Sequence, residues 1–377
     1  MHKQEFCLDV NSSTTRLVSK EKPAIEKKPI DKFETLLFLP EGEGRKGEGG
    51  LRTKGLFKHS YRNIGERWHI CDSEDQPTPA DAETAQRIQE NVDRLDGSSE
   101  MKEVPLISII TVVFNGDQHL EESIVSLLNQ TYPNVEYIII DGGSTDRTLN
   151  IIKKYEDYID YWISEPDTGL YDAMNKGIIL STGHLIGILN SDDWYEENAL
   201  EVVFRYFNLY NDGDVYYGNN GIYSEKKELL FYRNSEDVIK MNQNKAFCHQ
   251  NAFIRIKDYK AFGLHDIKYK IAADYDLIYK FLINNCRFYK INQYLLNYRL
   301  GGVSSKSVFQ GRREELDIKI KYGVSSFNAY FSFARAILRL MIRRILKLEE
   351  DSIIIKLYLK LFSPSIKPVE HETKFKQ

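Results

Sequence analysis

Leu106–Phe114, with the sequence LISIITVVF, is a continuous apolar run rich in β-branched residues. Such a run is typical of a strand buried on both faces of a sheet. A second run of this kind is Val135–Ile140 (VEYIII), and between the two runs Gln118–Asn129 places its apolar residues at helical spacing. The sequence therefore predicts a strand, a helix and a strand in succession, which is the repeating unit of a parallel sheet.

The same rhythm continues along the chain. A helix is expected over Thr148–Tyr155, a third strand over Tyr158–Ser164, a second long helix over Tyr171–Leu180 and a fourth strand over His184–Leu189. We therefore predict the α/β class, with a mostly parallel sheet flanked by helices on both faces. Ligands of such sheets bind beyond the carboxyl ends of the strands.

Composition excludes several other classes of protein. The chain has 377 residues, of which 42% are hydrophobic and 28% charged, and its formal net charge is −4. This charge argues against nucleic acid as a partner, because binding to its backbone needs a large basic surface. The four cysteines form no C-x-x-C pair, which favours a reducing compartment over a disulfide scaffold or a zinc ribbon. No signal peptide or membrane-spanning run is visible, so we expect a cytoplasmic protein.

Polar side chains follow each predicted strand at the point where it ends: Asn115, Asp141, Glu165 with Asp167, and Asp192 with Asp193. Adjacent carboxylates repel each other unless a cation or a hydrogen-bond donor lies between them. Oxygen ligands of this kind suit Mg²⁺ or Mn²⁺, which also bind phosphate oxygens. The alternative is that Asp192 and Asp193 only cap a helix that begins at Glu196. There is no Walker A loop and no G-x-G-x-x-G motif, so a bound nucleotide would need a metal to neutralise its phosphates.

Four stretches in order carry a family resemblance: PLISIITVVFN, LLNQTYPNVEYIIIDGGSTDRT, SEPDTGLYDAMNKGI and GHLIGILNSDDW. Residues 105–205 resemble the nucleotide-sugar half of glycosyltransferase family 2, which has the GT-A fold. FCHQNAFIRI, IAADYDLIYKFL and YRLGGVSS resemble the acceptor half of that family. EGGLRTKGLFK resembles a lead-in found in members that assemble bacterial polysaccharides.

The resemblance implies a donor site at the strand ends. Asp192 would bind a Mn²⁺ or Mg²⁺ cofactor, Asp193 would lie next to the donor sugar, and Asn190 would replace the first aspartate of the family's DXD motif. The remaining residues implied to contact the nucleotide sugar are Thr111, Val113, Asn115, Asp141, Asp167, Gly169 and Asn175. Two departures from the family pattern stand out: Gly142 replaces an aspartate, and Met174 replaces an arginine that would face the phosphates, a role that Lys176 could take.

On the acceptor side, the resemblance implies that Asp274 is the catalytic base, with Ala273 in place of the usual glutamate. The alternative is that Asp274 caps the helix Tyr275–Leu282. His249 and Gln250 would bind the diphosphate or the metal, although a lone histidine near a strand is often structural. Gly301–Ser304 is either a phosphate-binding turn or a plain turn.

Three segments are expected along the chain. Residues 1–104 form a polar N-terminal extension, either a linker with partial order or an accessory region, which includes one helix over Ala80–Leu95. Residues 105–322 form the glycosyltransferase domain, divided into the nucleotide-sugar half 105–205 and the acceptor half 206–322. Residues 323–377 form a basic amphipathic tail, in which Ser332–Leu348 repeats arginine or lysine every four residues. This tail would either bind a membrane surface, placing the protein on the inner face of the plasma membrane, or pack against protein.

The sequence thus predicts an inverting, metal-dependent glycosyltransferase that moves a sugar from a nucleotide-sugar donor, UDP-linked, to a saccharide acceptor. That acceptor would be a lipid-linked intermediate of cell-surface polysaccharide synthesis. A non-catalytic nucleotide-sugar-binding or scaffold subunit of a membrane assembly complex is the alternative, motivated by Asn190, Met174 and Ala273. A nucleotidyltransferase is disfavoured because Asn115–Gln118 supplies no glycine-rich, basic phosphate loop.

Overall fold

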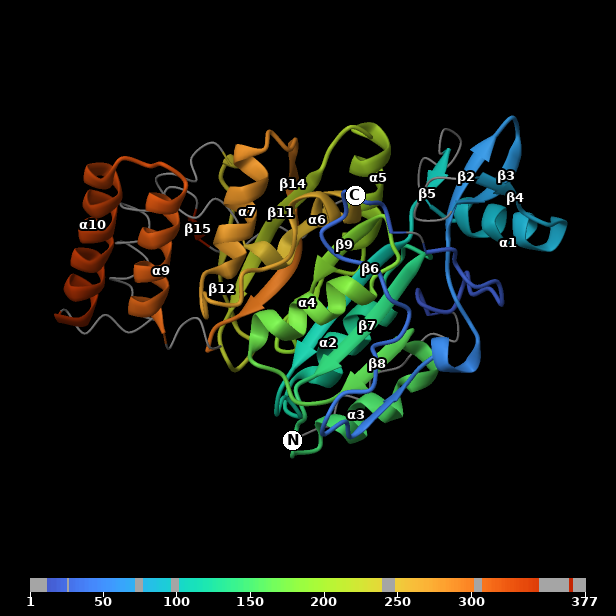
Figure 1. The fold of residues 1–377 in the computed structure, drawn as a ribbon, viewed down its shortest axis with the longest axis horizontal. Coiled ribbons are helices and arrows are strands. Elements are labelled where there is room, and N and C mark those ends of the chain that lie inside the picture. The colour runs from blue at the N-terminus through green and yellow to red at the C-terminus, as the bar shows by residue number, and fades with distance from the viewer. Residues whose placement is uncertain are drawn as a thin grey trace.

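The structure, a computed structural model, describes residues 12–25, 27–71, 77–95, 102–238, 248–301, 307–345 and 366–368. Within these residues one sheet of eleven strands forms the centre of the molecule (Figure 1). Its path runs β1-β8-β7-β6-β9-β13-β11-β12-β15, with β14 beside β11 and β10 beside β14. Among these residues, no helix is both long and apolar enough to cross a lipid bilayer.

The parallel core of the sheet contains the four strands that the sequence predicts. They are β6 (Ile107–Val113), β7 (Val135–Asp141), β8 (Tyr161–Ser164) and β9 (Leu185–Ile188), and every residue in them is buried. β6 pairs in parallel with both β7 and β9, and β7 pairs in parallel with β8. The predicted α/β class is confirmed. β8 begins three residues later than predicted, because Glu156–Tyr158 forms a 3₁₀ turn (η3) before it.

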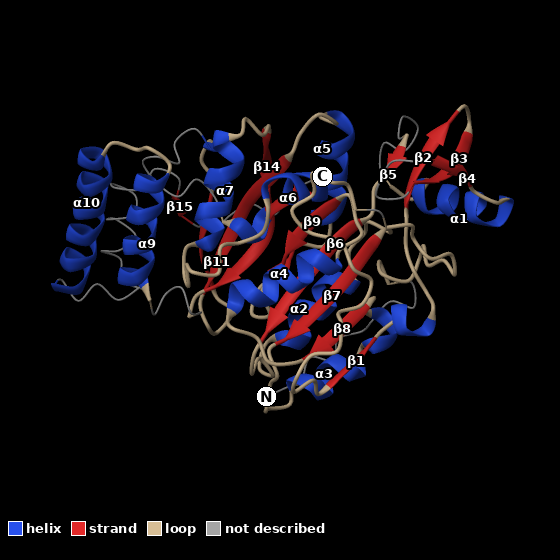
Figure 2. Ribbon diagram, viewed as in Figure 1, coloured by secondary structure: helices blue, strands red, loops and turns tan. Residues whose placement is uncertain are grey.

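Helices cover both faces of the sheet, as the secondary-structure view shows (Figure 2). Alternate residues of β6 point to opposite faces of the sheet. Ile109 packs in one core with α2 (Leu120–Leu128) and α5 (Ala199–Leu209). Ile110 packs in the other core with α4 (Leu170–Leu180) and α7 (Ala273–Ile283). The other connecting helices are α3 (Thr148–Lys154) and α6 (Ile256–Phe262). The sheet therefore packs against an apolar core on each of its two faces.

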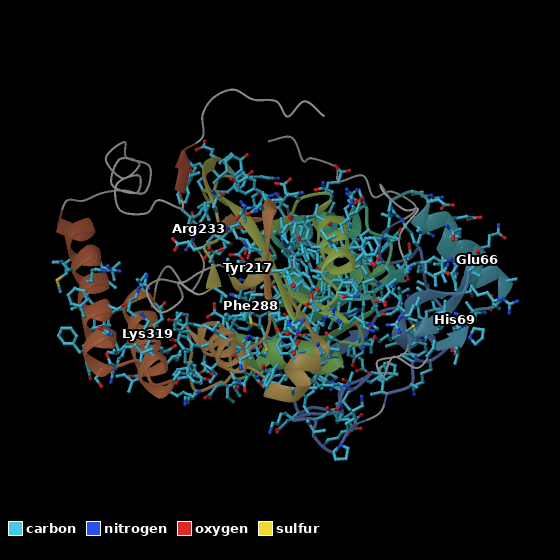
Figure 3. The ribbon with its side chains drawn as sticks, turned by 90° about the horizontal axis from the view of Figure 1, so that it is seen from above. Glu66, His69, Tyr217, Arg233, Phe288 and Lys319 are labelled. Carbon is cyan, nitrogen blue, oxygen red and sulfur yellow. The ribbon has the colours of Figure 1, made fainter. Side chains whose placement is uncertain are left out.

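The second half of the sheet is mixed. It contains β10 (Trp194–Tyr195), β11 (Val215–Tyr223), β12 (Leu229–Arg233), β13 (Ala252–Arg255), β14 (Phe288–Arg299) and β15 (Ile366–Pro368), and a 3₁₀ turn, η5 (His249–Asn251), precedes β13. β13 is antiparallel to its neighbours β9 and β11, whereas β14 is parallel to β11. β14 therefore ends near the rim at which the parallel core strands end. The view from above places Tyr217 of β11 and Phe288 of β14 near the middle of the molecule (Figure 3).

The N-terminal segment contributes elements of its own. β1 (Gly47–Gly49) adds an antiparallel strand to the edge of β8, and a 3₁₀ turn, η1 (Arg52–Lys54), follows it. A separate sheet contains β2 (Ser60–Ile64), β3 (Arg67–Cys71), β4 (Pro77–Pro79) and β5 (Glu103–Val104). The predicted helix is α1 (Ala82–Val92), which begins after Asp81, whose side chain accepts a hydrogen bond from the Thr84 amide. Phe33, Phe57, Tyr61 and Trp68 are buried.

The C-terminal helices lie at the opposite end of the molecule from the small sheet (Figure 1). They are α9 (Val308–Lys321) and α10 (Ser326–Ile345), and α10 covers most of the predicted helix Ser332–Leu348. They contact each other through the rings of Phe309 and Phe333, whose centroids are 6.3 Å apart. The part of the predicted tail beyond residue 345, apart from β15, lies outside the described residues.

Two buried ion pairs attach the N-terminal segment to the sheet. The Arg52 guanidinium donates to the Glu136 carboxylate at 2.6 Å, and the Lys58 ammonium donates to Asp160 at 2.6 Å. Burial opposes ionisation of Glu136, but the charge of Arg52 and hydrogen bonds from Ser108 and Thr182 hold its pKa below the ordinary value. The segment is thus held to the sheet by charges that have no access to water.

Arg52→Met should lower the free energy of unfolding by about 3–5 kcal/mol, because it leaves a buried carboxylate without its cation. The loss should be greatest near neutral pH and should shrink as the pH falls and Glu136 becomes protonated, since the depressed pKa stabilises the fold only while the carboxylate is charged. Urea denaturation at several pH values measures both effects. The control is Arg62→Met, whose pair with Glu103 is partly exposed and should cost about 0–1 kcal/mol. Equal losses in the two variants would contradict the role of Arg52.

Candidate functional site

The polar residues predicted at the strand ends gather along one rim of the sheet. Asn115 follows β6, Asp141 is the last residue of β7, Asp167 follows β8, and Asn190–Asp193 follow β9. Asn115 adopts a positive φ of 50°, which turns the chain sharply at the end of β6. Its backbone amide donates to the Ser144 hydroxyl, and its side-chain oxygen accepts from the Thr145 amide at 2.8 Å.

Asp141 is fully buried and organises the turn that follows β7. Its carboxylate accepts hydrogen bonds from the Ser144 amide and hydroxyl and from the Ser164 hydroxyl, the last at 2.6 Å. The neighbouring glycine accounts for one departure from the family pattern: a Cβ at Gly142 would lie 2.4 Å from the Asp167 carboxylate. A side chain at this position would therefore push Asp167 away, and Gly142 allows the two loops to approach.

The contacts continue from the β6 end to the β9 end. A Cβ at Gly116 would lie 3.3 Å from the Ser191 hydroxyl, so the two loops touch. The Ser123 hydroxyl of α2 donates to the Asn190 carbonyl at 3.3 Å. Thr111 and Val113, in contrast, are buried within β6, and the Thr111 hydroxyl accepts a hydrogen bond from Tyr137. The Val113 side chain lies beside Gly116 at the end of β6, whereas the Thr111 hydroxyl is engaged within the sheet.

The Asp192–Asp193 pair lies in a strongly desolvated place. Burial raises the pKa of the Asp192 carboxyl, against the influence of His119 and Arg299. Burial, together with the charge of Asp192, raises the pKa of Asp193 well above its ordinary value. Neither residue caps the next helix, so that alternative is wrong: α5 begins at Ala199, its N-cap residue is Asn198, and the Asp193 carboxylate accepts a hydrogen bond from the Arg299 amide at 2.7 Å.

The residues present fit a divalent cation. Two adjacent carboxylates with raised pKa values would both be stabilised in the charged form by a cation between them. The buried side-chain oxygen of Asn190 has no hydrogen-bond partner within the part of the chain that the structure describes. All of these are the hard oxygen donors that Mg²⁺ and Mn²⁺ prefer.

Arg299, the last residue of β14, holds this loop in place. Its Nε donates to the Asp192 carbonyl at 3.0 Å, one terminal nitrogen donates to Glu122 at 2.7 Å, and the other donates to the Glu225 carbonyl. The guanidinium also lies 5.0 Å from the centroid of the Trp194 ring. Sequence reasoning missed this arginine, although it stands at the start of the YRLGG stretch, because no local pattern links it to residues more than a hundred positions earlier.

Asp274 lies in the first turn of α7 and lines a small cavity. One carboxylate oxygen is 3.0 Å from His249 Nδ1, and the other is 3.2 Å from the Tyr171 hydroxyl. The cavity wall also includes His265 and several apolar residues, namely Ile188, Ala252, Ile254, Tyr259, Leu277 and Ile278. The N-cap position of α7 is Ala272, so the alternative that Asp274 only caps this helix is wrong.

His249 and Gln250 connect the two parts of the site. The Nε2 atom of His249 is buried and has no hydrogen-bond partner within the described residues, and the same holds for the side-chain oxygen of Gln250. The Gln250 side chain also favours the charged form of Asp193. The site therefore runs from Asp193 through η5 to Asp274. The turn over Gly302–Ser304 lies outside the described residues.

Asn175 and Gly169 belong to the wall between the two halves. The Asn175 amide nitrogen donates to the His265 carbonyl at 2.9 Å, and its oxygen accepts from the His265 amide. Burial lowers the pKa of His265 to about 3, so this imidazole is neutral. Gly169 precedes α4 with a φ of 131°, a conformation that favours glycine, and its amide donates to Asp167 at 2.8 Å.

Lys176 is the basic residue expected to face the phosphates at the rim of the sheet, but Arg45 and Lys46 also lie near this rim. Lys176 forms an ion pair with Glu165 at 2.8 Å, and Arg45 binds the same carboxylate at 2.9 Å. Lys46 donates to the carbonyls of Gly143 and Ser144, at 2.7 and 2.9 Å. Arg45 and Lys46 come from the N-terminal segment, and only their approach to the β7 turn in the fold identifies them.

Known glycosyltransferases match part of this chain in sequence. The family model described as glycosyl transferase family 2 matches residues 108–263. A glycosyltransferase of Mycobacterium bovis named for PGL/p-HBAD biosynthesis is 30% identical over 176 residues, which cover 46% of this chain and 68% of the relative. An uncharacterized glycosyltransferase of Rickettsia typhi is 33% identical over 188 residues, and the match spans 59% of its length.

Among solved structures, a mannosyltransferase of Pyrobaculum calidifontis in complex with GDP-Man and Mn²⁺ matches 69% of this chain and 82% of its own, with a TM-score of 0.48 and 13% identity. TarS of S. aureus, residues 1–349 in complex with UDP-GlcNAc, matches 61% of this chain and 71% of its own, with a TM-score of 0.44 and 16% identity. On the sequence matches, this chain belongs to glycosyltransferase family 2.

Proposed function

We propose that the chain is an inverting, metal-dependent glycosyltransferase that transfers a sugar from a nucleotide sugar, UDP-linked, to a saccharide acceptor. The observation that carries the proposal is that Asp141, Asp192 and Asp193 follow strands at one rim of the sheet, with the Asp274–His249 pair next to η5. A donor bound along the strand ends would have its diphosphate near the Asp192 loop and its reacting carbon towards Asp274. Membership of glycosyltransferase family 2 supports this reading.

The reaction requires a base on the acceptor side. The acceptor hydroxyl attacks the anomeric carbon as the bond from that carbon to the diphosphate breaks, and the hydroxyl proton passes to Asp274. His249 would orient the carboxylate through its Nδ1 atom, and Tyr171 would hold the second oxygen. A divalent ion held by Asp192, with Asn190 and Asp193 beside it, would offset the charge of the departing diphosphate.

The acceptor and its location belong to the same proposal. α10 exposes several large apolar residues, namely Phe327, Tyr330, Phe331, Leu338 and Met341, and the sequence repeats basic residues every four positions along it. A helix with aromatic and basic residues of this kind is typical of a membrane surface. We therefore propose a lipid-linked acceptor at the inner face of the plasma membrane. The relative named for PGL/p-HBAD biosynthesis supports an acceptor of this class.

A non-catalytic sugar-nucleotide-binding subunit is the second candidate. It is favoured by Asn190 in the metal motif, by the pairing of Lys176 with Glu165, and by Ala273, which is fully buried where the family has glutamate. The next experiment separates the two candidates.

Asp274→Asn should reduce sugar transfer by about 10²–10⁴-fold, because an amide cannot accept the proton. Release of the nucleotide from a panel of UDP-sugars, with and without acceptor, measures this. The matched control is Asp276→Asn, a buried carboxylate in the same helix turn that pairs with Lys321 at 2.6 Å, and it should lose stability but keep its turnover number. Full activity of Asp274→Asn, or donor binding by the wild type without any turnover, would favour the scaffold function.

Asp192→Asn should raise the dissociation constant for Mn²⁺ by about tenfold or more, measured by the electron paramagnetic resonance signal of free Mn²⁺ in the presence of a nucleoside diphosphate. Because burial raises the pKa of Asp192, protons compete with the metal, and the wild-type dissociation constant should rise as the pH falls. Asp172→Asn on α4 serves as the control. Unchanged Mn²⁺ affinity in Asp192→Asn would remove this residue from the metal site.

The double variant Phe327→Ser/Phe331→Ser should lose binding to vesicles that contain anionic phospholipid, and wild-type binding should weaken as salt is raised. Co-sedimentation measures both. Ile64→Ser, which removes an exposed apolar residue of the small sheet, is the control and should bind as the wild type does. If the wild type does not bind vesicles but forms dimers, and the double variant does not dimerise, then α10 packs against protein and not against a membrane.

A further inference from the structure

A second group of metal-ligating side chains lies at the end of the sheet opposite the candidate active site. Asp214 immediately precedes β11, Cys286 lies two residues before β14, and Asp258 lies in the first turn of α6, directly after β13. β14 has 12 residues, from Phe288 to Arg299, and spans about 35 Å, so Cys286 before its start is at least about that far along the chain from Arg299 at its end. No step of the proposed transfer reaction uses this group.

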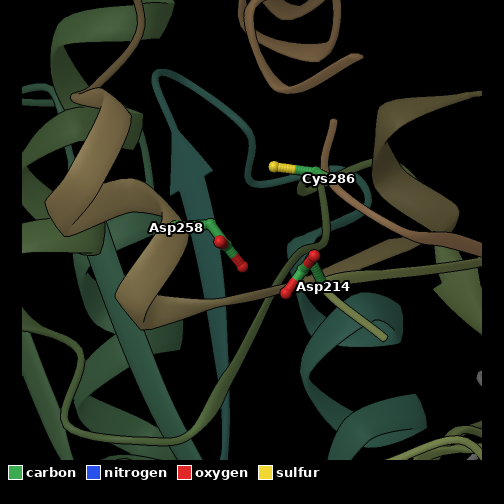
Figure 4. A group of neighbouring side chains, drawn as sticks. All are labelled: Asp214, Asp258 and Cys286. Carbon is green, nitrogen blue, oxygen red and sulfur yellow. The ribbon is translucent and has the colours of Figure 1, made fainter. Parts of the chain in front are cut away.

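The three side chains share one small space. One oxygen of each carboxylate and the Cys286 sulfur all lie within 4.8 Å of one another. The close-up shows the two carboxylates facing each other, with the sulfur directed towards the same space (Figure 4). Each residue comes from a different segment, and all three meet because β11 lies between β13 and β14.

Asp258 supplies an independent indication of a ligand. Asp258 is only 6% exposed, and its Oδ2 atom has no hydrogen-bond partner within the described residues. Burying a carboxylate oxygen without a hydrogen-bond partner costs free energy, and a bound cation would offset this cost. Burial and the charge of Asp214 raise the pKa of Asp258 to about 7. Two neighbouring carboxylates without a cation between them are expected to show such a shift.

The neighbouring cations bind Asp214 or backbone carbonyls. Lys257 pairs with Asp214 at 2.8 Å and is largely exposed, and the Arg255 Nε donates to the Gly213 carbonyl at 2.6 Å. Among the described residues, no lysine or arginine forms an ion pair with Asp258. The Arg287 amide donates to one oxygen of Asp214 at 2.9 Å and Lys257 pairs with the other, so a metal would displace Lys257 from Asp214, whereas the Oδ2 atom of Asp258 has no partner among the described residues.

We propose that Asp214, Asp258 and Cys286 form a Zn²⁺ site, with water as the fourth ligand. A thiolate with carboxylates in a four-coordinate site suits Zn²⁺, whereas Mg²⁺ and Ca²⁺ prefer oxygen ligands alone. On binding, the Cys286 thiol and any protonated carboxyl release their protons, and the ion takes their place. The ion would join the starts of β11 and β14 to α6.

Co²⁺ replaces Zn²⁺ in such sites and reports its ligands, because a thiolate bound to Co²⁺ gives a charge-transfer band in the near ultraviolet. The full-length protein titrated with Co²⁺ should develop this band, and Zn²⁺ should remove it by displacement. Cys286→Ser should abolish the band, and Asp258→Asn should raise the Zn²⁺ dissociation constant by about tenfold or more. Zn²⁺ should raise the melting temperature of the wild type but not of Asp258→Asn.

Two controls separate this site from other metal sites. Cys71→Ser changes a buried thiol of the small sheet and should keep the band. Asp192→Asn should also keep the charge-transfer band, because Asp192 belongs to the other proposed metal site. Failure of the proposal for Asp192 and failure of the Zn²⁺ proposal are therefore distinguishable. A wild type without the band and without a Zn²⁺-dependent shift in melting temperature, or a band that survives in Cys286→Ser, would overturn the proposal.

Discussion

The hydrogen bond from the Arg299 amide to the Asp193 carboxylate joins the two halves of the sheet at the rim where the polar groups gather. Asp193 follows β9, in the parallel core, and Arg299 ends β14, in the mixed half. The same arginine side chain holds the Asp192 carbonyl and Glu122 at the start of α2. A buried carboxylate that accepts from a backbone amide and lies beside a buried guanidinium leaves the loop little freedom. The orientation of Asp192, and with it the proposed metal site, depends on these contacts of Arg299.

Much of the fold could be predicted because its signals are local. The apolar runs of β6 and β7 are long and rich in β-branched residues, and the intervening helices have clear periodicity. Helix starts were harder to predict. Asp193 and Asp274 both stand where a cap would stand, but their carboxylates are engaged by the Arg299 amide and by His249, partners that only the tertiary structure brings near.

The gathering of polar residues at one rim was predictable, because residues after successive parallel strands must share a rim. The sequence could not indicate which of them turn outward. Thr111 lies on the right strand, yet its hydroxyl is engaged by Tyr137 within the sheet. Arg299, Lys46 and Arg45 approach the rim from distant parts of the chain, and no spacing rule connects them to it. Long-range packing, rather than local pattern, selects these residues.

β1 covers the outer edge of β8, pairing residue by residue from Gly47 with Ser164 to Gly49 with Trp162. An uncovered edge strand offers its amides and carbonyls to any other chain. The stretch matched by the family model begins at residue 108, well after β1. The residues that cover this edge of the central sheet, and so hinder association through it, therefore come from outside the stretch that the family model matches.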